Sequence, residues 1–119
     1  MKLLTADIRK KLLRNGRVHQ QRDEAGEPEP DFVPVVKLLT PDAGCTWLLT
    51  EIDPEDPDIA YGLCDLGLGC PELGSVRLSE LEAVRGKLNL PVERDLYFTA
   101  TKTLSAYAGE ARAHGAVKA

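Results

Sequence analysis

The chain has 119 residues, of which 43% are apolar and 29% are charged, and its formal net charge is −4. A chain of this length can bury a hydrophobic core unaided, so the sequence predicts one small domain over residues 1–119. No apolar run reaches the ~20 residues of a membrane span, and the first residues become charged too early for a signal peptide. We therefore expect a cytoplasmic protein that does not associate with membranes.

The charge is segregated along the chain. Residues 1–22 contain seven basic side chains and one acidic one, whereas residues 38–76 contain eight acidic side chains and no Lys or Arg. Such asymmetry describes the surface potential rather than the fold. It predicts weak or no binding to nucleic acid, because the acidic region repels phosphate and only the first segment attracts it.

The first segment predicts a helix over residues 5–15, because Leu4, Ile8 and Leu12 recur every four positions and share one face. Gly16 suits the left-handed residue that ends many helices. Three basic side chains lie off this apolar stripe and are expected to be solvated: Lys10, Lys11 and Arg14.

Residues 17–31 contain one strongly apolar side chain, Val18, among many charged ones. Such a composition buries too little apolar surface to offset the entropy of ordering, which predicts a mobile loop or linker. His19 lies in this segment and His114 lies near the end of the chain. Neither is therefore expected to be held firmly enough to act as a catalytic base.

The central part of the sequence predicts an antiparallel sheet of four to five strands. A Pro-Asp-Ala-Gly turn at residues 41–44 separates two segments rich in β-branched and aromatic residues, as in a β-hairpin. The predicted strands are 34–39, 45–52, 59–66, 75–78 and 96–99. In the second of them, alternation places Trp47 and Leu49 on one face and Ile52 on the other.

Two more helices complete the predicted α+β fold. Ser79 and Glu82 have the spacing of a capping box, which begins a short central helix ending at Gly86. Residues 104–114 are rich in alanine and predict a C-terminal helix, followed by a polar tail at 115–119. The apolar faces of the strands must be buried against these helices. The predicted core consists of Val35, Val36, Leu38, Trp47, Leu49, Leu63, Leu81 and Phe98.

The densest acidic cluster lies between the second and third predicted strands and consists of Glu51, Asp53, Glu55, Asp56 and Asp58. Two prolines break the strand in this stretch. The cluster lacks the central glycine of an EF-hand calcium loop. We interpret it as a solvated acidic surface and a candidate interaction site, and we predict no metal site and no cofactor.

A second set of carboxylates supports an alternative hypothesis and consists of Asp65, Glu72, Glu93 and Asp95. If these side chains converged within ~5 Å, they could hold a metal ion for a hydrolase or nuclease. The D…E-x-K spacing of many such nucleases is missing from the sequence. Arg94, which separates two of these acids, is expected to form a structural ion pair.

The cysteines and glycines favour structural roles. Cys45, Cys64 and Cys70 form no CxxC pair, so they are expected to be free thiols and small buried hydrophobes rather than zinc ligands. Gly67 and Gly69 are not followed by a GK[ST] motif or directly by a helix. They therefore predict a tight turn or a bulge rather than a phosphate-binding loop.

Three segments carry a resemblance to a known family: PVVKLLTPDAGCTWLLTEIDPEDPDIAYGLCDLGLGCPELG, LSELEAVRG and LPVERDLYF. Together they resemble a bacterial domain-of-unknown-function family, and the resemblance includes the N-terminal helix. Members of that family are typically encoded on plasmids, integrative elements and phages, near or fused to antirestriction and DNA-processing proteins. The resemblance implies a role in the service of a mobile element and supplies no reaction.

These observations favour a mobile-element-associated accessory protein that acts as a non-enzymatic interaction module, in a counter-defence or DNA-transfer context. Its acidic surface is expected to contact a protein partner. The alternative from a different class is the metal-dependent hydrolase or nuclease built on Asp65, Glu72, Glu93 and Asp95.

Overall fold

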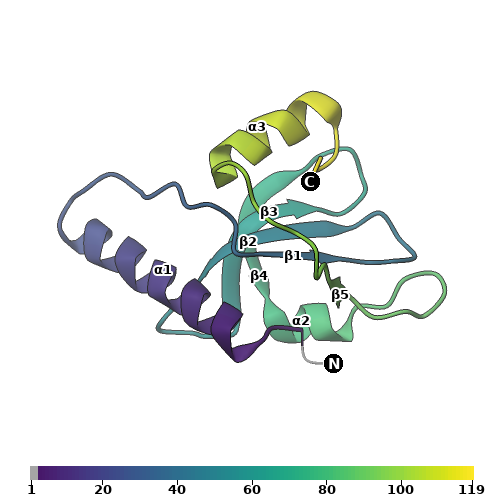
Figure 1. Cartoon of the computed structure of the whole chain (residues 1–119), viewed down its shortest axis with the longest axis horizontal. Coiled ribbons are helices and arrows are strands. Elements are labelled where there is room, and N and C mark those ends of the chain that lie inside the picture. Colours follow the sequence, from purple (N-terminus) through teal and green to yellow (C-terminus); the bar gives the residue numbers. More distant parts are fainter. Residues whose placement is uncertain (1–2) are drawn as a thin grey trace.

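The computed structural model describes residues 3–119 and consists of a five-stranded antiparallel sheet with three helices (Figure 1). In chain order the elements are α1 (Ala6–Glu24), β1 (Val36–Leu39), β2 (Thr46–Ile52), β3 (Ile59–Asp65), β4 (Glu72–Arg77), α2 (Leu78–Ala83), β5 (Glu93–Arg94) and α3 (Leu104–His114). The strand order across the sheet is β4-β3-β2-β1-β5. The predicted α+β class, with N-terminal, central and C-terminal helices, is confirmed.

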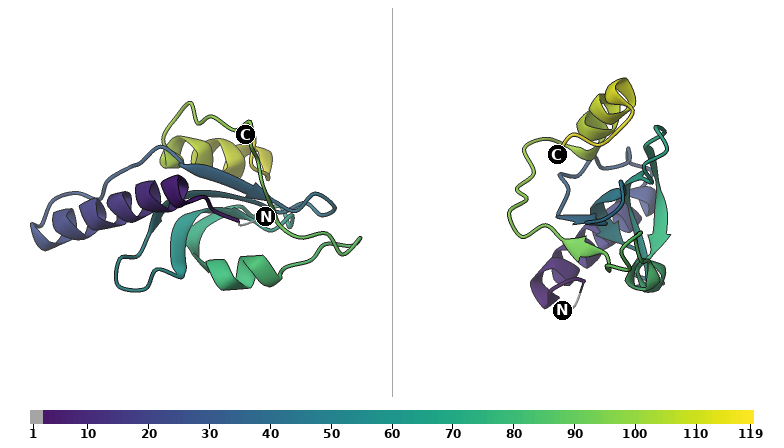
Figure 2. Two further views of the ribbon diagram at one scale, coloured as in Figure 1. Left: turned by 60° about the horizontal axis from the view of Figure 1, so that its bottom comes forward. Right: turned by 90° about the vertical axis from the view of Figure 1, so that its right-hand side faces the viewer.

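The helices cover opposite faces of the sheet and bury two apolar clusters. α1 and α2 lie on one side of the sheet, and α3 lies on the other (Figure 2). The first cluster contains Leu12 of α1 and Leu81 of α2, and the second contains Leu104 and Tyr107 of α3. The sheet is therefore the middle of three layers, as expected when both of its faces are apolar.

The predicted core residues are buried as expected, but they are divided between these two clusters. Val36, Leu38, Trp47, Leu49, Leu63 and Leu81 are buried, while Val35 and Phe98 are half-buried. Six of the eight pack in the first cluster. Leu63 and Phe98 belong to the second cluster, beneath α3.

An irregularity in β2 changes the predicted face of one residue. The pairing of β2 with β3 shifts register between Leu49 and Glu51. Such a bulge adds one residue to the alternation and reverses which face the following side chains occupy. Ile52 therefore packs in the first cluster with Trp47 and Leu49, contrary to the simple alternation predicted from the sequence.

The first helix is longer than predicted and extends to Glu24, so a mobile loop over residues 17–24 is contradicted. Gly16 lies within the helix and is buried. A Cβ atom at this position would overlap the carbonyl oxygen of Ile52, so glycine permits close packing of α1 on β2. This tertiary contact continues the helix where local composition predicted disorder.

The last strand also differs from its predicted position. β5 consists of Glu93 and Arg94, paired with Leu39 and Leu38 of β1, whereas strand 96–99 is not formed. Asp95 ends the pairing, because its Oδ1 accepts a 2.9 Å hydrogen bond from the main-chain N–H of Tyr97 and forms a turn.

β4 and α2 begin differently from the sequence prediction. β4 starts at Glu72, before the predicted residue 75, and pairs with β3 along its length. The capping box is not formed, since the helix begins at Leu78 and its N-cap Arg77 makes no side-chain cap. The helix ends at Ala83 rather than Gly86.

The chain after α3 is anchored to the sheet. Gly115 has φ 73° and ends α3 in the left-handed conformation. The following turn brings the N–H of Val117 to Asp65, and the Val117 side chain packs on the second cluster. The predicted polar tail at 115–119 is thus attached to the domain at this point. No helix within residues 3–119 has both the length and the apolar character needed to cross a membrane.

Candidate functional site

The candidate site lies where α1 takes the place of a strand beside β2. β1 pairs with β2 only as far as Leu49, whose carbonyl also accepts a 2.9 Å bond from the N–H of Val35. On the next residue, the carbonyl oxygen of Thr50 accepts a 2.9 Å bond from Nδ2 of Asn15. α1 therefore supplies polar contacts to the half of β2 that β1 leaves free.

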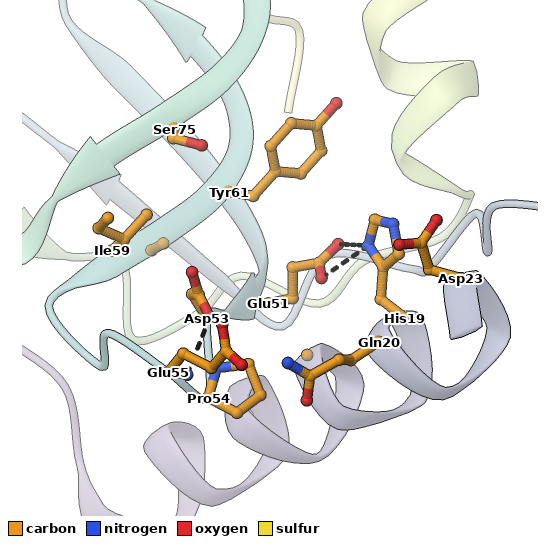
Figure 3. Close-up of a pocket in the computed structure, with 12 residues that line it drawn as sticks. His19, Gln20, Asp23, Glu51, Asp53, Pro54, Glu55, Ile59, Tyr61 and Ser75 are labelled. Atoms are coloured by element: carbon orange, nitrogen blue, oxygen red, sulfur yellow. Dashed lines mark hydrogen bonds and ion pairs between the residues drawn. The ribbon is translucent and has the colours of Figure 1, made fainter.

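One helical turn further, His19 meets Glu51 (Figure 3). The ring Nδ1 lies 3.0 and 2.9 Å from the two carboxylate oxygens of Glu51, whose side chain is only 12% exposed. Since a carboxylate only accepts, Nδ1 is the donor. The other ring nitrogen, Nε2, lies 4.0 Å from the exposed carboxylate of Glu29. The imidazole is therefore held between one sheltered and one solvated acid.

Cross-strand pairing extends the site away from this pair. Glu51 of β2 is the partner of Tyr61 of β3, and Tyr61 is the partner of Ser75 of β4. Directly opposed residues in antiparallel strands share a face, so the three side chains form a row across the sheet. All three line a cavity beside the second half of α1. Figure 3 shows Glu51 turned toward His19, while Tyr61 points away from that helix, on the face of the sheet that α3 covers.

The cavity has a volume of about 330 Å³. Its lining contains four acidic residues and no Lys or Arg: Asp23, Glu51, Asp53 and Glu55, with His19 as the one other titratable side chain besides Tyr61. Asp23, Asp53 and Glu55 are exposed. Like-signed charge around a concave surface concentrates the potential there. The cavity is therefore a site of negative potential, which we call the acidic pocket.

The environment of the acidic pocket shifts the pKa of Tyr61. Burial of the phenol raises its pKa, and the negative charges of Glu29 and Glu51 raise it further. Both effects disfavour the phenolate, so Tyr61 presents a neutral aromatic ring and a hydroxyl to the pocket at physiological pH.

The predicted interaction cluster divides into two groups. Glu51, Asp53 and Glu55 line the acidic pocket. Asp56 and Asp58 instead lie 3.4 and 3.6 Å from Nη1 of Arg77 on β4. These two acids are partly neutralised within the fold, so the pocket-facing group presents the uncompensated charge.

Asp58 has a further structural role at the start of α2. Its carboxylate accepts bonds from the main-chain N–H of Ser79 at 2.9 Å and from the Ser79 hydroxyl at 2.6 Å. These bonds, followed by the charge of Arg77, lower the pKa of Asp58. Asp58 thus supplies the cap that the sequence assigned to Ser79 and Glu82.

The four carboxylates of the hydrolase hypothesis do not converge. Glu72 and Glu93 lie on β4 and β5, the two opposite edge strands of the sheet. Asp65 is buried and accepts bonds from the N–H groups of Gly67 and Val117. Within residues 3–119, no group of three or more His, Cys, Asp or Glu side chains is arranged to hold a metal ion.

Asp95 and Arg94 have structural contacts near β5. Asp95 lies 3.5 Å from Nζ of Lys37. Arg94 donates a 2.8 Å bond from Nη1 to the carbonyl of Leu3, which attaches the segment before α1 to the sheet edge. Both residues therefore join segments of the fold rather than a common site.

All three cysteines are free thiols, as predicted. Cys64 and Cys45 are partly buried, and burial raises the pKa of the Cys64 thiol to about 11. Cys70 is exposed, which contradicts its expected role as a buried hydrophobe. It lies in the turn between β3 and β4, where Gly67 and Gly69 adopt positive φ as a tight turn requires.

The sequence did not identify His19 as part of the site, although a signal was present. Leu12, Asn15, Gly16 and His19 follow each other at helical spacing, so they continue the apolar stripe of α1 with polar side chains. A periodicity count restricted to apolar residues ends at Leu12. Polar residues that bond to a neighbouring strand extend the contact face beyond that point.

The outer side of α1 carries the opposite charge. Lys10, Lys11, Arg14 and Arg17 are all exposed. We call these four residues the basic ridge. The solvated basic face predicted from the sequence is confirmed for the first three.

The fold and the site define a small α+β domain with an acidic pocket between its first helix and an antiparallel sheet. The chain belongs to the family described as protein of unknown function, DUF2958, whose family model matches residues 3–118. Comparisons with curated proteins and with solved structures find no match.

Proposed function

We propose that this domain is a non-enzymatic interaction module whose acidic pocket binds a basic side chain of a protein partner. The observation that carries the proposal is the pair of exposed carboxylates, Asp53 and Glu55, at the rim of a cavity whose lining contains no Lys or Arg. Asp56 and Asp58 of the same loop instead lie close to Arg77, and Asp58 also accepts a bond from Ser79.

The pocket has the chemistry that a guanidinium or ammonium group requires. Carboxylates at the rim supply charge-assisted acceptors, and the ring of Tyr61 supplies a surface for a cation–π contact. The bond to His19 fixes the carboxylate of Glu51 at the floor. A volume of about 330 Å³ suits one or two side chains rather than a large cofactor.

We place this activity in the cytoplasm, in the service of a mobile element and in a counter-defence or DNA-transfer context. Three segments support this context, because they resemble a family that is encoded on such elements: the segment around the hairpin, LSELEAVRG and LPVERDLYF. The alternative of a metal-dependent hydrolase has less support, because Glu72 and Glu93 occupy opposite edges of the sheet.

The test compares two doubly substituted variants that change the net charge equally. Asp53→Asn with Glu55→Gln removes charge from the pocket rim, while Glu80→Gln with Glu82→Gln removes it from exposed positions on α2. The probe is a blocked seven-residue peptide of alternating Thr and Val with a central arginine, and citrulline replaces the arginine in the control peptide.

We expect the pocket variant to bind the arginine peptide at least tenfold more weakly than the α2 variant, by calorimetry at low salt. Binding should weaken with added salt, because exposed charges are screened over ~8 Å at physiological ionic strength. Equal binding by the two variants, or equal binding of the arginine and citrulline peptides, refutes the proposal.

A further inference from the structure

β4 is an edge strand with an unused side. It is first in the order β4-β3-β2-β1-β5, and only β3 pairs with it within residues 3–119. Its six residues offer a template of ordinary strand length, whereas β5 at the other edge has two. An unpaired edge of this kind accepts an added strand through main-chain hydrogen bonds.

The register shows which groups face outward. Ile59 is opposite Arg77, and one step further the N–H of Leu78 donates a 2.8 Å bond to the carbonyl of Asp58. Hydrogen-bonded and non-bonded pairs alternate along antiparallel strands, so the even-numbered residues of β4 bond to β3. The N–H and C=O groups of Leu73, Ser75 and Arg77 are therefore directed away from the sheet.

Ser75 connects this open edge to the acidic pocket. It lines the pocket, and it is the β4 member of the row that contains Tyr61 and Glu51. A strand added at β4 would place its own residue next in the row, ~4.8 Å beyond Ser75 and ~14 Å from Glu51. An arginine side chain spans roughly 7 Å, so it would cross Ser75 and bring its cation over Tyr61, toward the carboxylates.

We propose that an extended basic segment of a protein partner binds as a sixth strand along the outer edge of β4, with one arginine or lysine laid across Ser75 into the acidic pocket. The proposal rests on the proposed function and specifies its partner as an extended segment. Main-chain bonds to Leu73, Ser75 and Arg77 supply the affinity, and the row of side chains selects the basic residue.

A second copy of this chain fits the edge less well. A two-fold pair of β4 strands must oppose residues of the same face, for example Ser75 with Ser75 of the copy. Such pairing sets Arg77 of the copy opposite Leu73, but that guanidinium already lies 3.4 and 3.6 Å from Asp56 and Asp58 of its own chain, and each chain has a net charge of −4. Charge complementarity therefore favours a basic partner over self-association.

The test separates the main-chain contact from the charge contact. Ser75→Pro removes an outward N–H, whereas Ser75→Ala retains it, and proline is tolerated on an edge strand when its nitrogen faces solvent. We expect the Pro variant to bind the arginine peptide at least tenfold more weakly than the Ala variant. Circular dichroism establishes that both variants are folded.

Two measurements on the unsubstituted protein test the inference without relying on the folding of a variant. The arginine peptide should slow amide hydrogen exchange at Leu73, Ser75 and Arg77. A version of the peptide that is N-methylated at the alternate main-chain nitrogens that face β4 should not bind. Unchanged exchange at these amides, undiminished binding of the methylated peptide, or dimerisation through β4 in sedimentation overturns the inference. If the variant with Asp53→Asn and Glu55→Gln loses binding but the Ser75→Pro variant does not, the proposed function stands and the sixth strand is refuted.

Discussion

Nδ2 of Asn15 donates a 2.9 Å hydrogen bond to the carbonyl oxygen of Thr50, on the stretch of β2 that β1 leaves unpaired. This bond satisfies a strand carbonyl with a helix side chain. It positions the next turn of α1, so that His19 reaches Glu51. The acidic pocket therefore depends on a helix that partly replaces a strand at this point of the sheet.

Gly16 lies where α1 closely approaches β2, whereas Gly109 is exposed on α3. The two helical glycines can therefore be compared by the same substitution. Gly→Ala in an exposed helix stabilises by up to ~1 kcal/mol. At Gly109 an added Cβ meets nothing within 4 Å, so we expect such a gain. At Gly16 the Cβ overlaps the Ile52 carbonyl, and we expect a loss of about 2–3 kcal/mol. Urea unfolding measures both, and a stabilising Gly16→Ala substitution contradicts the described packing.

Cys64 predicts loss of stability at alkaline pH. Its pKa is raised from 9.0 to about 11 by burial, so the folded state retains a proton that the unfolded state releases. The contribution of Cys64 to stability is constant below pH 9 and is lost as the pH rises toward 11. Because the thiol is partly exposed, we expect a loss of only about 1–2 kcal/mol.

Cys64→Ala should reduce this alkaline loss, and Cys70→Ala should leave it unchanged, because Cys70 is exposed. Chemical unfolding at pH 8, 9.5 and 10.5 gives the comparison. Identical pH profiles for the two variants would show that Cys64 does not carry the effect.

Asp31 predicts a loss of stability at acidic pH. It accepts a 3.0 Å bond from the N–H of Ser105 and a further bond from the Ser105 hydroxyl, where Thr103, the N-cap of α3, forms no side-chain cap. The hydroxyl bond is the main cause of its lowered pKa. Its contribution is therefore present near neutral pH and is lost as the pH falls below 3.8.

Asp31→Asn should destabilise the protein at pH 7 by about 0.5–1 kcal/mol, the lower part of the range for helix caps, because the site is exposed. At pH 2.5 the variant and the parent should be equally stable. Thermal unfolding at both pH values tests this, and a difference of the same size at pH 2.5 rules out a role for the charge.

The basic ridge predicts that duplex DNA binds weakly and only at low salt. Replacing Lys10, Lys11 and Arg14 with Gln should abolish binding to duplex DNA at low salt. Deletion of residues 1–22 is unsuitable, because Leu12 belongs to the core. Three phosphate contacts give a salt slope of about −3. Gel shifts at low and physiological salt measure this, and tight binding at physiological salt by the substituted protein contradicts it.

Local patterns predicted the hairpin, the third strand and the C-terminal helix, because alternation, turn residues and alanine content act within a few positions. They did not predict residues 17–24 as helix or Ile52 on the face of Trp47. Both features arise from long-range contacts, the packing of Gly16 on β2 and the bulge between β2 and β3. Each contact joins two segments that are distant in the sequence, so the pattern within one segment does not predict it.

The candidate site was predicted in part. The acidic loop was recognised from its composition, but the sequence could not show that Asp56 and Asp58 face Arg77 while Asp53 and Glu55 face a cavity. It follows that neutralising all five acids is a poor test, since Asp58 also caps α2 and Glu51 holds His19. The paired substitutions at Asp53 and Glu55 avoid both structural roles.

The most direct measurement of the central claim is the map of chemical-shift changes in the unsubstituted protein, at neutral pH, as the arginine peptide is added. We predict the largest changes at His19, Glu51 and Tyr61, and their absence with the citrulline peptide. Changes centred on the basic ridge, or the same changes with both peptides, would contradict the assignment of the acidic pocket as the binding site for a basic side chain.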